Sequence, residues 1–169
     1  MQDFTSDGAY NDFSRTNRLK SWDAIMMQRN NESHALPELH FLQNFATKHN
    51  WDVSHHFLNA AAEGTQAVII TNLVEQILWV NKSFIKMTGY SGREVYDRSP
   101  KMLQGKDTAL IARIQIRKCI SNRSVCSTDI LNYRKNGQQY WCRVEIHPVY
   151  NHDRELVNFL SFEQEITPA

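Results

Sequence analysis

The pattern of apolar and polar residues changes along the chain from helical spacing to strand alternation. Between Leu39 and Ala46 apolar residues recur every three or four positions, which predicts a helix that begins near Pro37 and ends near Asn50. The same spacing predicts an earlier helix over 19–29. The second half alternates instead and predicts three long strands, at about 125–134, 139–149 and 156–166.

The middle of the chain carries shorter elements bounded by capping residues. They are, in order, a helix capped by Ser54 and ending at Gly64, strands at 66–71 and 76–80, a helix at 82–87, a turn capped by Ser91 and Glu94, a loop at 97–106 and a long helix at 109–122. We expect the long helix to turn one side inward, through Leu110, Ile111, Ile114, Arg117 and Ile120. The chain thus combines several helices with a run of three consecutive strands, which is typical of an α+β fold.

Residues 1–16 are polar and show no sustained period, which predicts a disordered arm. We expect 17–56 to form an N-terminal helical extension and 57–167 to form one domain. A net charge of +1, from 19 basic and 18 acidic residues, provides no field that would attract nucleic acid. The sequence has no apolar run long enough to cross a bilayer and no signal-peptide pattern, so we expect a cytoplasmic protein without nucleic-acid or membrane partners.

The three cysteines, Cys119, Cys126 and Cys142, are odd in number and lack C-x-x-C spacing. We therefore expect reduced thiols and neither a disulfide framework nor a zinc site. The histidines form no cluster with metal-ligand spacing. Because the sequence also lacks a nucleophile elbow, a phosphate-cradling glycine loop and a nucleophile and base pair, we expect no enzyme activity.

Two neighbouring segments carry a family resemblance. At 77–91 a strand-like Ile-Leu-Trp-Val is followed by Asn-Lys-Ser-Phe-Ile-Lys-Met-Thr-Gly-Tyr-Ser, and the loop at 97–105 reads Asp-Arg-Ser-Pro-Lys-Met-Leu-Gln-Gly. Over about 57–167 the chain resembles a PAS sensor domain, and the loop resembles that of the flavin-binding LOV branch. The resemblance implies a five-stranded antiparallel sheet whose concave face, with the flanking helices, encloses a ligand.

The LOV resemblance also shows what this chain has lost. In LOV domains the loop carries a cysteine that attacks the excited flavin, and the matching residue here is Pro100, which has no nucleophile. Covalent LOV photochemistry is therefore not expected. The resemblance still assigns Lys101 and Arg117 to the flavin phosphate and Gln104 to the ribityl chain. An FMN cofactor thus remains compatible with the loop.

The positions around the flavin ring are partly changed. Asn132 matches one of two ring-facing asparagines, Cys142 replaces the other, and Glu163 replaces the glutamine that reports flavin chemistry. Cys142 removes donor and acceptor capacity from the ring edge. The cofactor-binding residues implied by the resemblance are Ser99, Lys101, Leu103, Gln104, Arg117, Ile120, Asn132, Cys142, Val144, Ile146, Phe159 and Glu163. Each polar residue of this set also has an interpretation without a ligand. Arg117 is then a solvated charge on a helix, and Glu163 is an exposed carboxylate at a strand end.

Strand alternation separates two faces of the predicted sheet. Alternation puts Ile130 on one face of its strand and Phe159 and Glu163 on one face of theirs, and the LOV resemblance implies that these faces line the hollow. The opposite set is too apolar to stay in water and contains Leu131, Tyr133, Trp141, Leu160, Phe162 and Ile166. We expect this outer face to be covered by the helix with Leu39, Leu42 and Phe45, and also by a second chain in a symmetric homodimer.

Two functions follow from these observations. The first is a PAS-type sensory and protein-interaction module, which couples a pocket ligand or the dimer geometry to a signalling partner protein. The alternative is an FMN-binding photoreceptor or redox sensor that works without a cysteinyl adduct.

Overall fold

The structure, a computed structural model, describes residues 36–167. Its five strands are β1 (Ala67–Thr71), β2 (Ile77–Val80), β3 (Cys126–Tyr133), β4 (Gln139–Tyr150) and β5 (Leu156–Ile166). They form one antiparallel sheet in the order β2-β1-β5-β4-β3. The expected five-stranded antiparallel sheet is thus confirmed. The predicted arm over 1–16 and the predicted helix over 19–29 lie outside the described residues.

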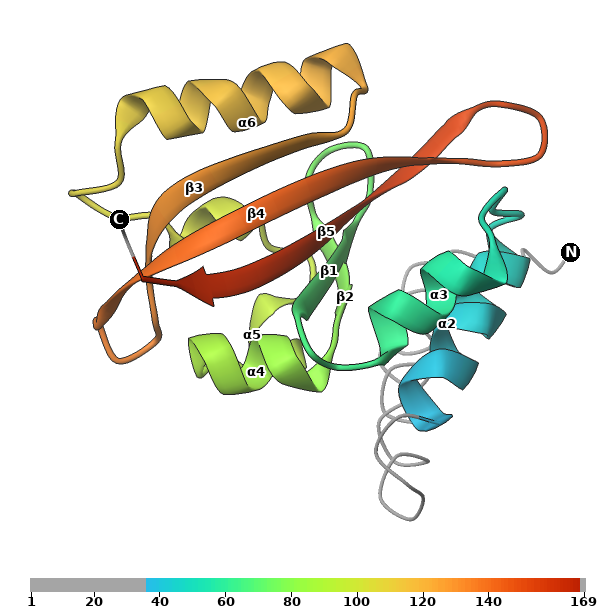
Figure 1. The fold of residues 1–169 in the computed structure, drawn as a ribbon, viewed down its shortest axis with the longest axis horizontal. Coiled ribbons are helices and arrows are strands. Elements are labelled where there is room, and N and C mark those ends of the chain that lie inside the picture. Colours follow the sequence, from blue (N-terminus) through green and yellow to red (C-terminus); the bar gives the residue numbers. More distant parts are fainter. Residues whose placement is uncertain (1–35, 168–169) are drawn as a thin grey trace, which may run out of the picture.

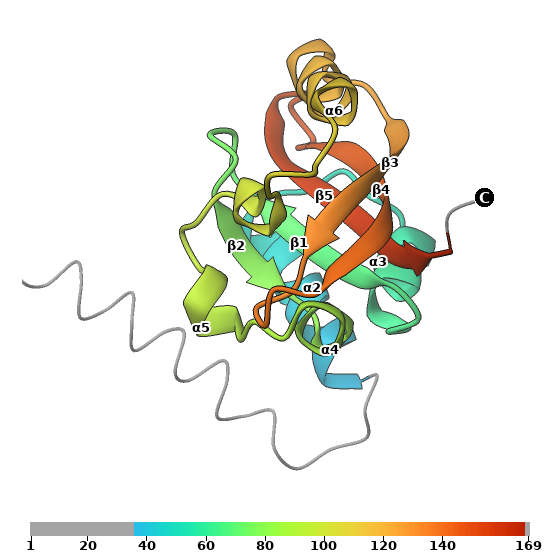
Figure 2. The same ribbon diagram turned by 90° about the vertical axis from the view of Figure 1, so that its left-hand side faces the viewer.

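Helices flank the sheet on both sides (Figure 1). They are α2 (Leu36–Lys48), α3 (His55–Ala62), α4 (Lys82–Thr88), α5 (Gly92–Val95), the 3₁₀ helix η2 (Pro100–Leu103) and α6 (Leu110–Asn122). In Figures 1 and 2 the strands run between α6 on one side and the α2–α3 pair on the other. No helix within 36–167 is long and apolar enough to cross a membrane.

The short helix α4 is fixed by its caps. The Asn81 side chain accepts hydrogen bonds from the backbone N–H groups of Phe84 (2.9 Å) and Val68 (3.0 Å), so one amide caps α4 and attaches it to β1. Gly89 ends the helix with φ of 77°, a left-handed conformation that glycine adopts at little cost. The predicted Ser91–Glu94 capping box is also present.

The outer face of the sheet is partly covered by α2 and α3. Leu42 and Leu58 pack in one core cluster with Trp79, Leu160 and Phe162. This confirms that the helix carrying Leu42 covers the outer face. Beyond that cluster the register places three half-exposed apolar residues in one row across β3, β4 and β5: Leu131, Trp141 and Ile166. A second chain over this row stays a prediction.

The long helix α6 is rotated from its predicted orientation. Leu110 and Ile111 are 69% and 64% exposed, so the expectation that they face inward was wrong. Ala112 is buried instead, and Ile116 and Ile120 follow it at steps of four residues toward the sheet. Apolar residues occur on two sides of this helix, so helical spacing alone did not decide which side faces the sheet.

The expectation of three reduced cysteines was also wrong. Cys119 and Cys126 form a disulfide, with their Cα atoms 6.0 Å apart, and only Cys142 is free. The end of α6 and the start of β3 meet because the chain reverses between them at Arg123, whose φ is 51°. Sequence spacing could not reveal this contact, since it depends on where the helix ends.

Candidate functional site

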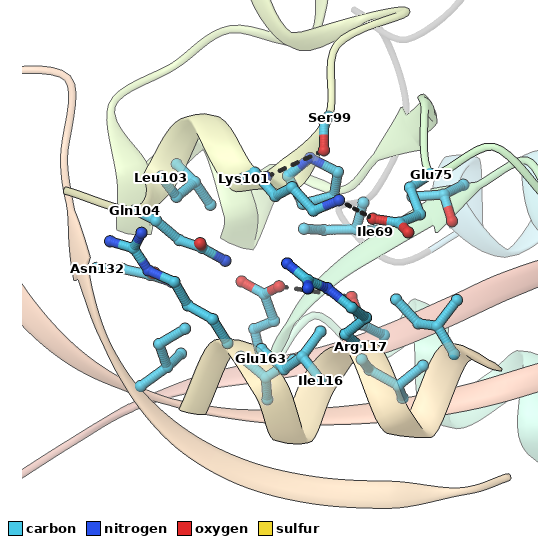
Figure 3. A pocket seen from close by; sticks show the side chains of 18 of the residues that line it. Ile69, Glu75, Ser99, Lys101, Leu103, Gln104, Ile116, Arg117, Asn132 and Glu163 are labelled. Atoms are coloured by element: carbon cyan, nitrogen blue, oxygen red, sulfur yellow. Dashed lines mark hydrogen bonds and ion pairs between the residues drawn. The ribbon is translucent and has the colours of Figure 1, made fainter. Parts of the chain in front are cut away.

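A cavity of about 600 Å³ lies between the inner face of the sheet, α6 and η2 (Figure 3). Its size is that of a typical small-molecule site. The residues that line it are Ile69, Thr71, Glu75, Ser99, Pro100, Lys101, Leu103, Gln104, Gly105, Lys106, Arg113, Ile116, Arg117, Ile120, Ile130, Asn132, Val144, Ile146, Phe159, Ser161 and Glu163. Apolar side chains come mainly from the strands and α6, whereas the cationic side chains come from η2, the loop after it and α6.

The structure brings together eleven of the twelve residues expected at the site, all except Cys142. Ile130 and Phe159 both line the cavity, so the predicted strand register is correct. Cys142 is fully buried beside the cavity, with its Sγ atom 3.9 Å from Glu163 Oε2. It would act on a ligand only through Glu163.

Glu163 is the most deeply buried ionisable group of the cavity, with 4% of its surface exposed. Desolvation raises its pKa to about 7, although Ser161 and Cys142 donate long hydrogen bonds to the carboxylate, at 3.5 Å and 3.9 Å. Burial likewise raises the pKa of the Cys142 thiol, and the neighbouring Glu163 charge raises it further. Near neutral pH, Glu163 can therefore either donate or accept a hydrogen bond toward a ligand.

Glu163 also borders a second, more polar cavity of about 560 Å³ on the side of α4. Lys86, Arg134 and Glu165 line this second cavity, and Arg134 donates to the Glu165 carboxylate. The residue Glu163 thus lies in the wall between the two cavities.

The cavity carries four cationic side chains: Lys101, Lys106, Arg113 and Arg117. Lys101 Nζ lies 2.6 Å from Glu75 Oε2, an ion pair that sequence reasoning missed (Figure 3). Glu75 belongs to the turn between β1 and β2, whose approach to the loop is a long-range contact without a local signal. The Lys101 charge is therefore partly neutralised before any ligand binds.

Arg113 is a second cavity residue that the sequence did not indicate. Its guanidinium donates to the Gly105 carbonyl, while its Nε atom is buried without a hydrogen-bond partner. A buried guanidinium nitrogen in this state is costly, so the Arg113 side chain is held at the cavity at the expense of one hydrogen bond. Arg113 was not expected at the cavity because the wrong side of α6 was predicted to face inward. It adjoins Ala112, which is on the side that is buried.

None of the cavity-lining residues is a cysteine. Pro100 stands at the first position of η2, where its fixed φ suits a helix start. The Ser99 side chain caps the same turn by accepting a hydrogen bond from the Lys101 N–H at 3.3 Å. The loop is thus built around Ser99 and Pro100 as a structural turn.

A family model described as PAS domain matches residues 65–168, which is more than half of the chain. The chain belongs to the PAS domain family. The relatives and the solved structures that it resembles place it with the LOV-like members. It is 37% identical over 91 residues to a blue-light-activated histidine kinase of Rhizobium johnstonii, and 35% identical over 91 residues to one of Brucella ovis. These matches cover 54% of this chain but only 26% and 19% of the two kinases.

Solved structures agree with this placement. A structure from a study of a flavin analogue and the Light-Oxygen-Voltage domain mechanism matches with a TM-score of 0.63 and 25% identity, covering 66% of this chain and 85% of its own. The LOV domain of the Erythrobacter litoralis EL346 blue-light activated histidine kinase matches with a TM-score of 0.58 and 26% identity, covering 62% and 98%. This PAS domain is therefore a LOV-like sensory signalling module.

Proposed function

We propose that this LOV-like PAS module binds FMN in its cavity and signals without forming a cysteinyl adduct. The observation that carries the proposal is the charge arrangement of the cavity. Cations gather at its α6 and loop sides, while Asn132, Gln104 and Glu163 reach into its interior (Figure 3). A planar polar ring joined to a phosphate matches this arrangement.

The residues present fit such a ligand. Lys101 and Arg117 would hold the phosphate, with the Arg113 guanidinium beside them where α6 meets the cavity. Gln104 would contact the ribityl chain, and Asn132 would contact the polar edge of the ring. Leu103, Ile130 and Phe159 supply apolar walls.

A bound flavin would supply blue-light absorption and electron transfer. The protein supplies the surroundings of the ring. Glu163 holds or releases a proton near neutral pH, at the position that a glutamine occupies in the LOV pattern. Because β5 pairs with both β1 and β4, a change in the hydrogen bonds of Glu163 would be passed to the centre of the sheet.

The output surface in this proposal is the outer face of the sheet. Leu131, Trp141 and Ile166 form an apolar row next to the region that α2 and α3 cover. We assign this row and α2 to a homodimer contact or to a signalling partner protein. The module then acts in the cytoplasm as a non-catalytic sensor, with 57–167 as its folding unit.

Binding of FMN can be tested by mass spectrometry of the small molecule released from purified protein and by titration of ligand-free protein with FMN. We expect stoichiometric FMN and weaker binding in Arg117→Glu. The affinity for riboflavin, which lacks the phosphate, should not change with that substitution. Protein that takes up neither flavin would contradict the proposal and favour the second candidate, an interaction module whose output depends on dimer geometry alone.

A further inference from the structure

A disulfide fastens the helix that forms one wall of the cavity. Cys119 lies near the end of α6, and Cys126 is the first residue of β3. The cavity-lining residues Ile116, Arg117 and Ile120 stand on both sides of Cys119 in the sequence. The sulfur–sulfur bond therefore joins the cavity wall directly to the sheet.

The other attachments of α6 are few. Of its 13 residues only Ala112 is buried, because much of the helix underside faces the cavity instead of a packed core. Thr128 Oγ1 donates to Gln115 Oε1 at 2.7 Å, and Arg113 donates to the Gly105 carbonyl. A helix that buries so little apolar surface opens more readily than one packed in a core.

The segment between the two sulfurs contains a turn with an unfavourable backbone conformation. The C-cap of α6 is Arg123, whose backbone has the left-handed conformation that favours glycine over residues with a Cβ atom. The Arg123 N–H bonds back to the carbonyls of Cys119 and Ile120, and the Ser124 N–H bonds to that of Cys119 at 3.2 Å. Breaking the disulfide would leave this unfavourable turn as the connection between α6 and β3.

We propose that Cys119–Cys126 is a thiol-based switch that sets how tightly α6 closes over the ligand cavity. The inference about ligand retention rests on the proposed flavin function, whereas the inference about α6 does not. In the switch a dithiol reductant delivers two electrons and two protons to the sulfur pair. The S–S bond breaks, two cysteine thiols form, and the reductant becomes a cyclic disulfide.

The surroundings suit such an exchange. Cys119 and Cys126 are both half-buried, so a small thiol can reach them, whereas Cys142 is fully buried. The raised pKa of the Cys142 thiol keeps it protonated and unreactive. Reshuffling of the disulfide to Cys142 is therefore disfavoured, and the switch has two states.

The direct test is amide hydrogen exchange of the full ligand-free chain, oxidised with glutathione disulfide or reduced with dithiothreitol. Maleimide labelling and intact mass give the number of free thiols in each state. We expect one free thiol after oxidation and three after reduction. Amides in the second half of α6 should exchange at least about tenfold faster in the reduced protein. Unchanged exchange, or three free thiols after oxidation, would overturn the switch.

Variants separate the disulfide from other effects of the reagents. Cys119→Ser/Cys126→Ser should exchange like the reduced protein under both conditions. Ser124→Ala changes an exposed residue between the two cysteines and should respond to oxidation as the wild type does. A response in the double-serine variant equal to that of the wild type would contradict the assignment to this sulfur pair.

A second experiment measures the rate at which FMN dissociates from the oxidised and from the reduced protein. Dissociation about tenfold faster from the reduced protein supports control of the cavity by the disulfide. Equal dissociation from both states contradicts that control even if α6 loosens. If neither the oxidised nor the reduced protein binds FMN, the proposed function is wrong. The hydrogen-exchange result alone then decides whether the disulfide acts as a switch.

Discussion

The carboxylate of Glu38 accepts a hydrogen bond from the backbone N–H of Lys82 at 2.8 Å, across 44 residues of sequence. Lys82 is the first residue of α4, so a side chain of α2 meets the positive end of another helix. Glu38 itself is 2% exposed. This contact connects the helix that covers the outer face of the sheet with the helix that follows β2.

Glu38→Ala should lower the free energy of unfolding by about 1–3 kcal/mol, because the Lys82 N–H would lose a buried, charged acceptor. Denaturant unfolding measures the change. Glu38→Gln keeps a hydrogen-bond acceptor on a side chain of the same length, so it should lower the free energy of unfolding by less than Glu38→Ala. Equal stability of the wild type and Glu38→Ala would show that this contact does not hold α2 against the domain.

Glu163→Gln should change the pH dependence of stability. Burial raises the Glu163 pKa from 4.5 to about 7, so the folded state binds more protons than the unfolded state between these values. The stability of the wild type should therefore be fully present below about pH 4.5, fall as the pH rises to about 7, and stay low above it. The loss is on the order of 3 kcal/mol.

Urea unfolding of both proteins at a series of pH values checks this expectation. Glutamine does not titrate, so the variant should show a flatter profile and a relative gain at pH 8, about 3 kcal/mol at most. Parallel profiles across the range would show that Glu163 has an ordinary pKa. They would also contradict its assigned role beside a ligand.

Glu75→Gln should strengthen FMN binding. The substitution removes the carboxylate that holds Lys101 Nζ at 2.6 Å and so frees a cation at the cavity. Because this ion pair is well exposed to solvent, the gain should be only about two- to fivefold at low salt and smaller at high salt. Riboflavin affinity is the control and should not change. An equal gain for both flavins would point to altered cavity shape instead of phosphate attraction.

Trp141→Glu should shift a homodimer toward monomer. Trp141 pairs with Leu131 on one side and with Ile166 on the other, so the substitution puts a charge in the middle of the apolar row. Light scattering at micromolar concentration measures the assembly. Ser124→Glu adds the same charge at an exposed position and should leave the dimer intact. A wild-type protein that is only monomeric would reject this contact.

The sequence predicted those features that depend on local patterns. Alternation in the last three strands placed Ile130 and Phe159 on the face that lines the cavity, because side chains of a strand point to opposite sides in turn. The cap at Ser54 and the Ser91–Glu94 capping box depend on neighbouring residues only. The family resemblance then supplied the single five-stranded sheet with a concave face toward a ligand, which no local pattern contains.

Features that depend on distant contacts were missed or misjudged. The disulfide arises where α6 ends, the Glu75–Lys101 pair arises where a turn meets a loop, and the inward side of α6 is set by packing. Cys142 was expected at the ligand because the resemblance matches it to a ring-facing asparagine. In the structure it does not line the cavity, and its Sγ atom lies against the Glu163 carboxylate instead.

The absorption spectrum of FMN-reconstituted protein, recorded before and after blue light, tests the central claim most directly. We predict a yellow protein whose blue band keeps its vibronic structure and does not bleach into a thioether adduct, because Pro100 stands where the reactive cysteine would be. A reversible loss of the blue band with an adduct spectrum would contradict the account. So would a protein that stays colourless after reconstitution.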